Sequence, residues 1–76
     1  MLNINKTHER GYTVYGFEAN NTDYDVLTED GKTFTVYSSN KSRSGLPAPK
    51  VYDSLSDLAK RSKTFEALAA FIAEGA

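Results

Sequence analysis

Aromatic, β-branched and polar residues alternate through the first half of the chain, a pattern typical of β-strands. One such stretch is YTVYGFEA at residues 12–19, which turn-forming Asn, Thr and Asp residues follow. The clearest local signal is a pair of extended stretches, residues 24–29 and 32–38, on either side of Asp30-Gly31. We therefore expect a three-stranded antiparallel meander.

The Asp30-Gly31 pair sets the predicted pairing of the last two strands. Asp-Gly is typical of a two-residue type I′ hairpin, because both of its residues accept a positive φ. Such a turn places Leu27 opposite Phe34, and Leu27, Phe34 and Val36 then share one face of the sheet with Asp25. The opposite face carries the other aromatic, branched and hydroxyl side chains of these strands, which are Tyr24, Val26, Thr28, Thr33, Thr35 and Tyr37.

The first strand can present either face to the core, depending on the length of the turn that begins at Asn20. A two-residue turn and a three-residue turn give this strand opposite parity. The three-residue turn brings Tyr15 and Phe17 to the face of Phe34, which collects the bulkiest apolar side chains on one side, so we favour it. Residues 1–5 can add a short edge strand.

The last third of the chain carries apolar residues at helical spacing. Ser54 can accept a hydrogen bond from the amide of Asp57, which predicts a helix start. One continuous helix of about 31 Å would overhang strands of about 20 Å. We therefore expect one broken helix or two short ones at about 54–61 and 65–74, and we favour two, with Thr64 as the cap of the second. Their shared apolar stripe comprises Leu55, Leu58, Ser62, Phe65, Leu68, Ala69 and Ile72.

Residues 38–50 (SSNKSRSGLPAPK) join the meander to the helices without any periodicity and hold three basic residues and no acidic one. Loops of this length in compact domains are usually functional or disordered. Together the elements predict an α+β fold. In it, a three-stranded meander, a long basic loop and two C-terminal helices packed on one sheet face form a single domain of residues 1–76.

Charge is unevenly distributed along the chain. Residues 40–63 hold six basic and two acidic residues and have a net charge of +4, whereas residues 1–39 have a net charge of −3. The whole chain has a net charge of −1. This distribution predicts a dipolar molecule and differs from the uniformly basic surface of most nucleic-acid-binding domains.

Composition and missing motifs exclude several classes of protein. No apolar run approaches the ~20 residues of a membrane helix, and neither Cys nor the apolar region of a signal peptide is present, so we expect a cytoplasmic protein with no membrane partner. His8, between Lys6 and Arg10, is the one imidazole; a ribonuclease-like site there is an alternative that we do not favour, because such triplets also occur as ordinary surface charges. The acids around Asp30 lack the spacing of a calcium loop. We expect no enzymatic activity, no cofactor and no catalytic or metal-binding residue.

The hypothesis that remains is a small non-enzymatic protein-binding module, such as an accessory or inhibitor protein of a phage or another mobile element. An aromatic sheet face and the basic loop carry it, and the predicted partner-binding residues are Tyr24, Val26, Tyr37, Lys41, Arg43 and Lys50. One alternative is a nucleic-acid-binding domain that uses the basic loop 41–50 and the basic residues 60–63. Another is a homo-oligomeric structural protein, so either a monomer or a homodimer is expected.

Overall fold

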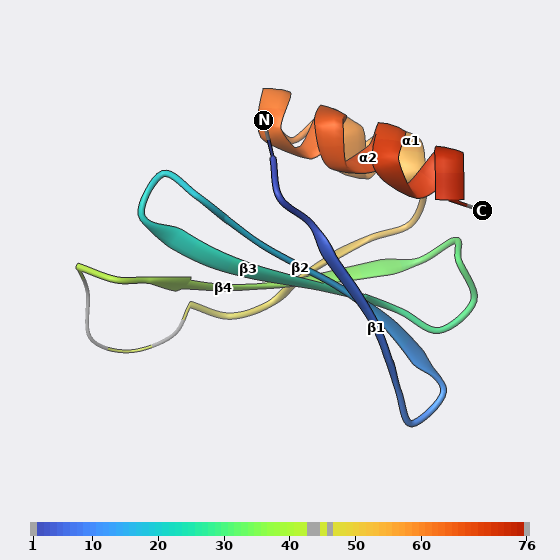
Figure 1. Ribbon diagram of the computed structural model, residues 1–76, viewed down its shortest axis with the longest axis horizontal. Helices are drawn as coiled ribbons and strands as arrows, with labels where there is room; N and C mark the ends of the chain where they lie inside the picture. Colours follow the sequence, from blue (N-terminus) through green and yellow to red (C-terminus); the bar gives the residue numbers. More distant parts are fainter. Residues whose placement is uncertain (1, 43–44, 46, 76) are drawn as a thin grey trace.

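The protein has an α+β fold built on one antiparallel sheet. The computed structural model describes residues 2–42, 45 and 47–75, and each strand in it pairs with the next along the chain (Figure 1). The meander predicted from the sequence is confirmed, but it has five strands instead of three. In chain order the strands are β1 (Asn5–Glu9), β2 (Tyr12–Ala19), β3 (Thr22–Thr28), β4 (Phe34–Asn40) and β5 (Lys50–Tyr52).

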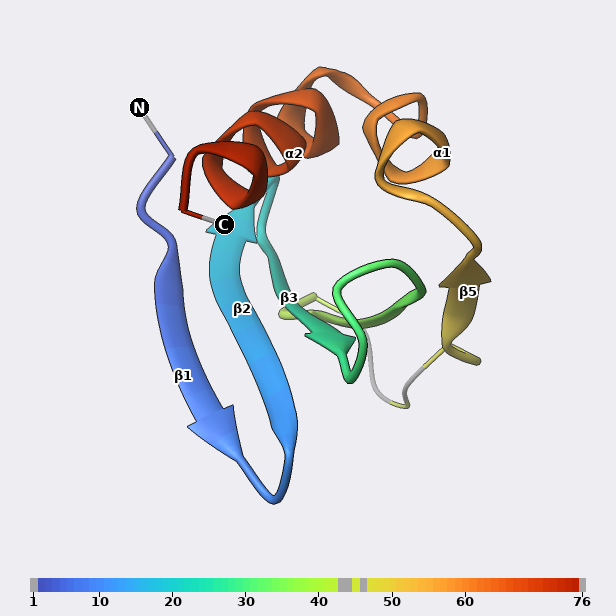
Figure 2. The ribbon, with the colours of Figure 1, turned by 90° about the vertical axis from the view of Figure 1, so that its right-hand side faces the viewer.

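Two helices, α1 (Leu55–Ala59) and α2 (Lys63–Gly75), follow the last strand. Figures 1 and 2 show both helices on the same side of the twisted sheet. The prediction of two short C-terminal helices is therefore confirmed. Within the described chain, neither helix is long and apolar enough to cross a membrane.

Serine side chains cap both helices. Ser54 Oγ accepts a hydrogen bond from the amide of Asp57 at 3.1 Å, which confirms the predicted start of the first helix. Ser62 Oγ accepts from the amide of Phe65 at 3.3 Å. The predicted cap at Thr64 is wrong, because Ser62 already serves the free amides of the first turn and Thr64 lies inside the helix.

The core lies between the helices and the sheet face that they cover. Rings of three aromatic residues meet there: Phe17 stacks on Tyr24 with the ring centroids 5.1 Å apart, and Phe65 contacts both rings edge-on. Burial of each Val, Leu or Phe side chain contributes roughly 1.5–3 kcal/mol, which holds the helices on this face. The buried cluster comprises Tyr15, Phe17, Val26, Phe34 and Val36 from the sheet and Leu58, Phe65, Leu68 and Ile72 from the helices.

The pairing of β3 with β4 differs by one residue from the predicted register. Leu27 lies opposite Thr35 instead of Phe34, and Val26 lies opposite Val36. As a result Val26 is fully buried in the core, whereas Leu27 is half-buried on the other face. The prediction that Leu27 shares the core face with Phe34 and Val36 is wrong, because a shift of one residue turns every side chain of a strand over.

The shift arises from the length of the connection, since residues 29–33 replace the expected two-residue turn at Asp30-Gly31. Asp30 Oδ1 accepts hydrogen bonds from the amides of Thr33 at 2.9 Å and Lys32 at 2.8 Å. The carboxylate thus accepts hydrogen bonds from two loop amides, which in a tighter turn would bond to backbone carbonyl groups instead. The same bonds favour the ionised carboxyl and hold the pKa of Asp30 below its ordinary value.

The turn between β2 and β3 is also different from the one we favoured. It has two residues, Asn20 and Asn21, with φ of 53° and 60°, a region that Asn accepts more readily than most residues. Each of the two turns shifts the register by one residue from the predicted one, and the two shifts cancel between β2 and β4. Tyr15 and Phe17 therefore face the core together with Phe34, as predicted, and only β3 is turned over.

The edge strands β1 and β5 lie outside the predicted meander. β1 spans Asn5–Glu9 where an edge strand at residues 1–5 was expected, and all five of its residues are exposed. A tight turn at Arg10-Gly11, with φ of 49° and 86°, joins it to β2. β5 begins inside the stretch predicted as a loop. Pairing with a neighbouring strand, rather than an apolar pattern of their own, places both edges in the sheet.

Candidate functional site

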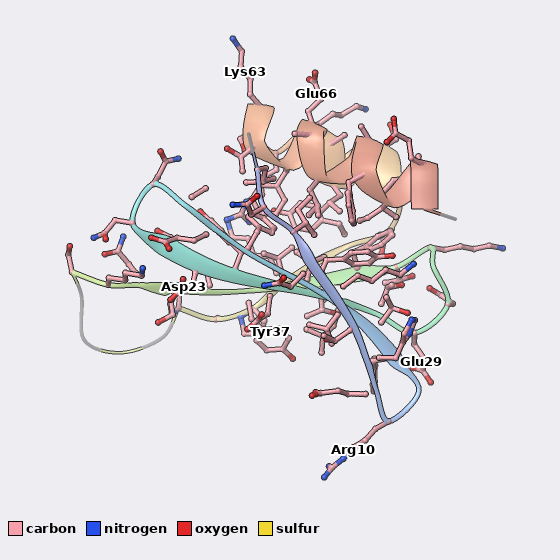
Figure 3. The ribbon with its side chains drawn as sticks, in the orientation of Figure 1. Arg10, Asp23, Glu29, Tyr37, Lys63 and Glu66 are labelled. Carbon is pink, nitrogen blue, oxygen red and sulfur yellow. The ribbon has the colours of Figure 1, made fainter. Side chains whose placement is uncertain are left out.

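One face of the sheet is covered by the helices and the other is open to solvent. In the described ranges no helix lies over the second face, and Tyr37 projects from it away from α1 and α2 (Figure 3). We call this surface the open face. An antiparallel sheet tolerates water on one side, so the residues that occupy this side decide what it can contact.

The open face consists of cross-strand rows about 6.8 Å apart, set by the strand register. The central row runs across all five strands and comprises Thr7, Val14, Leu27, Thr35 and Val51. The row next to it comprises Asn5, Gly16, Asp25 and Tyr37, and the row beyond that comprises Glu18, Asp23 and Ser39. On the other side of the central row lie Glu9 and Tyr12.

Apolar and aromatic side chains form the middle of the open face. Val14 and Leu27 are direct cross-strand neighbours and both are half-buried. Tyr37 is 45% exposed and Val51 is 62% exposed, both high values for large side chains. Together with Pro47 from the loop before β5, Val14, Leu27 and Tyr37 line a hollow of about 620 Å³. This arrangement gives the face an apolar centre into which a side chain can fit.

A second hollow, of about 750 Å³, adjoins the first and shares Asp23 and Asp25 with it. Its floor includes Gly16, which pairs in register with Asp25 and forms no bulge. A β-carbon at Gly16 would lie 3.2 Å from Asp25 Oδ1. The glycine thus allows close packing, with the Asp25 carboxylate lying against the strand at this position.

The charge of the open face is acidic. The structure describes every residue of the five strands. Among the strand residues that point to this face there is no Lys or Arg, and four are acidic: Glu9, Glu18, Asp23 and Asp25. Carboxylates therefore lie on both sides of the central row. An apolar centre with a polar rim is the usual composition of a protein–protein contact surface.

Lys41 lies beside the end row of the open face. Its Nζ is 2.7 Å from Glu18 Oε2, and both side chains are about half exposed. The hydrogen bond to Glu18 raises the pKa of Lys41 above its ordinary value, and the charge of Asp23 acts in the same direction. One ammonium group of the chain itself thus partly neutralises two of the four acids.

Two of the predicted site residues, Tyr24 and Val26, do not lie on the exposed face predicted for them. Val26 is fully buried, and Tyr24 is half-buried on the helix side, where its ring contacts Phe17 and Phe65. The prediction that they share an exposed face with Tyr37 is wrong. Its physical cause is the one-residue shift in register, which turns β3 over relative to β4.

The other predicted site residues have different surroundings. Lys50, the first residue of β5, is exposed and pairs with Val36, while Lys41 is exposed and bound to Glu18. Arg43 lies outside the described residues. That Tyr37, Lys41, Arg43 and Lys50 contact a partner stays a prediction.

The basic residues 60–63 do not form a single charged surface. Lys60 and Lys63 are exposed, and Lys63 points away from the sheet in Figure 3. Arg61 instead packs inward: its guanidinium carbon lies 4.6 Å from the centre of the Phe65 ring, and Nη1 donates a hydrogen bond of 2.8 Å to Tyr52 Oη. Arg61 also lies near the Tyr24 ring, 5.7 Å from its centre. This arginine joins the helices to the sheet.

His8 lies on the exposed edge strand β1, where its Nδ1 is 3.3 Å from Thr13 Oγ1. In the part of the chain that the structure describes, no three His, Asp or Glu side chains converge as metal ligands do. The acids of the open face are spread over several rows instead. Chemically, the surface offers shape, apolar area and negative charge.

The residues that sequence reasoning missed are Val14 and the acids of the open face, and it assigned Leu27 to the core. The signal that could have found them is the composition of β3, where Asp23, Asp25 and Leu27 alternate with Tyr24, Val26 and two threonines. Acids on one side of a strand favour the solvent for that side. Comparisons of the chain with protein-family models, with curated proteins and with solved structures found no match.

Proposed function

We propose that the chain is a small non-enzymatic protein-binding module that contacts its partner through the open face. The observation that carries this proposal is that the helices cover one side of the sheet, while the other side presents Val14, Leu27 and Tyr37 around a hollow of about 620 Å³. Tyr is enriched at interfaces because it offers apolar area with a polar tip. A module that covers part of a partner's surface can act as an accessory or inhibitor protein. We propose this role for the chain, as for the small proteins of this kind that phages and other mobile elements encode.

The two alternatives receive less support from the surface. Nucleic-acid binding would rely on residues 41–50 and 60–63, but Lys41 is engaged with Glu18 and Arg61 is packed among aromatic rings. The open face itself would repel phosphates. A homodimer through the open face would bring the acids of two copies together, because a two-fold interface presents the same patch from each subunit.

Affinity capture with matched variants tests the proposal. The immobilised chain is exposed to bacterial lysates beside a Leu27→Ser/Tyr37→Ser variant. A Phe71→Ser variant serves as the control, because Phe71 is 38% exposed on α2, on the helix side. Circular dichroism verifies that each variant is folded. We expect a protein that the wild type and the Phe71→Ser variant retain and the double variant loses.

Two results would contradict the proposal. One is equal retention of the same proteins by the wild type and the open-face variant. The other is loss of binding with Phe71→Ser alone, which would place the contact on the helix side. Sedimentation of the free chain distinguishes the homo-oligomer, since a stable dimer that the open-face variant disrupts would identify a second copy as the partner.

A further inference from the structure

Resting on the proposed function, we propose that the open face recognises a surface rich in Lys and Arg on its partner protein. The proposal starts from the placement of charge in the rows. Asp25 lies in the row directly beside the central row, between Gly16 and Tyr37 along the register, and Glu9 lies on the other side. A partner side chain that packs on the central row therefore has a carboxylate on either side of that row.

Lys and Arg have the dimensions that this arrangement requires. Their aliphatic stems can lie on apolar surface while the charged head reaches a polar group. Neighbouring rows of the open face are about 6.8 Å apart, which is close to the length of these stems. A stem packed on Val14 and Leu27 can thus place its ammonium or guanidinium group beside Asp25, whereas a shorter or anionic side chain cannot satisfy both contacts.

Lys41 provides an independent observation of the same chemistry. Its ammonium group already occupies the acidic end row, 2.7 Å from Glu18 Oε2 and within the field of Asp23. The chain thus shows that this row accepts a Lys head group. Among the described residues no ion pair engages Asp25 or Glu9, so these carboxylates are available to cations from a partner. Complementary charge would also speed association and orient the partner.

Titration with defined peptides tests the inference. The probe is an eight-residue peptide of alternating Arg and Ser, its control is the same peptide with Glu in place of Arg, and the readout is the amide spectrum of the ¹⁵N-labelled chain. We expect the Arg peptide to shift the amides of Val14, Asp25 and Leu27 and to bind at least about fivefold more weakly at about 200 mM than at about 20 mM salt. We expect the Glu peptide to shift none of them.

Matched variants refine the test. Asp25→Asn removes one charge from the open face with little change in shape, and we expect it to weaken binding of the Arg peptide about three- to tenfold. Lys41→Gln frees Glu18 and Asp23 and should strengthen binding about twofold. Glu66→Gln is the control, because Glu66 is exposed on α2 and points away from the sheet (Figure 3); its affinity should equal that of the wild type.

The inference is overturned if the Glu peptide binds as well as the Arg peptide. It is also overturned if Glu66→Gln weakens binding as much as Asp25→Asn, or if the shifts centre on α2. Failure here is distinguishable from failure of the proposed function. A partner captured through Leu27 and Tyr37 that neither competes with the Arg peptide nor depends on salt would leave a binding module whose partner is not basic.

Discussion

Truncation of two neighbouring residues of β3, Val26 and Leu27, gives opposite expectations for the two possible registers. Val26 has no exposed surface and lies opposite Tyr15 and Val36 under the helices. Val26→Ala removes two methyl groups, worth about 1.6 kcal/mol at ~0.8 kcal/mol each, and leaves a cavity in a close-packed core. With the cavity included we expect a loss of about 2–3 kcal/mol in the free energy of unfolding.

Leu27→Ala removes one carbon more but should cost less. Leu27 is half-buried on the open face, the side of the sheet opposite to α1 and α2. Solvent fills the space that the side chain leaves, so no sealed cavity forms and we expect a loss below about 1 kcal/mol. The smaller truncation is therefore predicted to be the more damaging one.

Urea unfolding followed by circular dichroism measures both variants against the wild type, and thermal unfolding provides a second readout. For a chain of this size 1 kcal/mol corresponds to roughly 4–8 °C in Tm, so Val26→Ala should lower Tm by about 10–20 °C. If Leu27→Ala were the more destabilising of the two, the register with Leu27 inward would be correct. The open face would then lose its apolar centre.

Three further predictions concern the turns and the helix–sheet contact. Asn20 has a φ of 53°, so Asn20→Ala should destabilise the chain by about 1 kcal/mol and Asn20→Gly should not; equal melting temperatures for the two variants would refute this. The pKa of Asp30 is lowered by the amides of Thr33 and Lys32, so its stabilising contribution is present above the carboxyl range of the unfolded chain and is lost as the pH falls through the folded pKa. The difference in Tm between the wild type and Asp30→Ala should accordingly shrink in acid, and a difference independent of pH would contradict the assigned hydrogen bonds. Arg61→Ala should cost about 1–2 kcal/mol, because the guanidinium contacts the Phe65 ring and Tyr52 Oη, whereas the exposed neighbour Lys60→Ala should stay within about 0.5 kcal/mol.

Local patterns sufficed for several elements of the fold. The aromatic and branched residues of 12–19 predict β2 with its observed bounds, because five of these eight residues are of the types that favour strands. Ser54 and Asp57 predict the start of α1, since a hydrogen bond within one turn depends on local geometry alone. Five members of the predicted apolar stripe are buried, whereas Ser62 is exposed: Leu58, Phe65, Leu68, Ala69 and Ile72.

The register of β3 could not be read from the same kind of pattern. Both of its faces carry apolar residues, Val26 on one and Leu27 on the other, so alternation alone does not choose between them. The choice depends on whether Asp30 closes a tight turn through its backbone or supports a longer loop through its carboxylate. The tight turn and the longer loop differ only in which groups accept a few hydrogen bonds of similar net strength, so the sequence pattern does not decide between them. The site prediction inherited this error, which is why Tyr24 and Val26 were placed with Tyr37.

The measurement that most directly tests the open face as the binding surface compares Tyr37→Ala with Tyr24→Ala in calorimetric titrations against the captured partner. Tyr37 projects from the open face, whereas Tyr24 packs on Phe17 and Phe65 under the helices. We predict that Tyr37→Ala weakens binding about tenfold or more without lowering Tm, and that Tyr24→Ala lowers Tm while its folded fraction keeps the wild-type affinity. The converse result, with affinity lost through Tyr24→Ala and retained by Tyr37→Ala, would place the partner on the other side of the molecule.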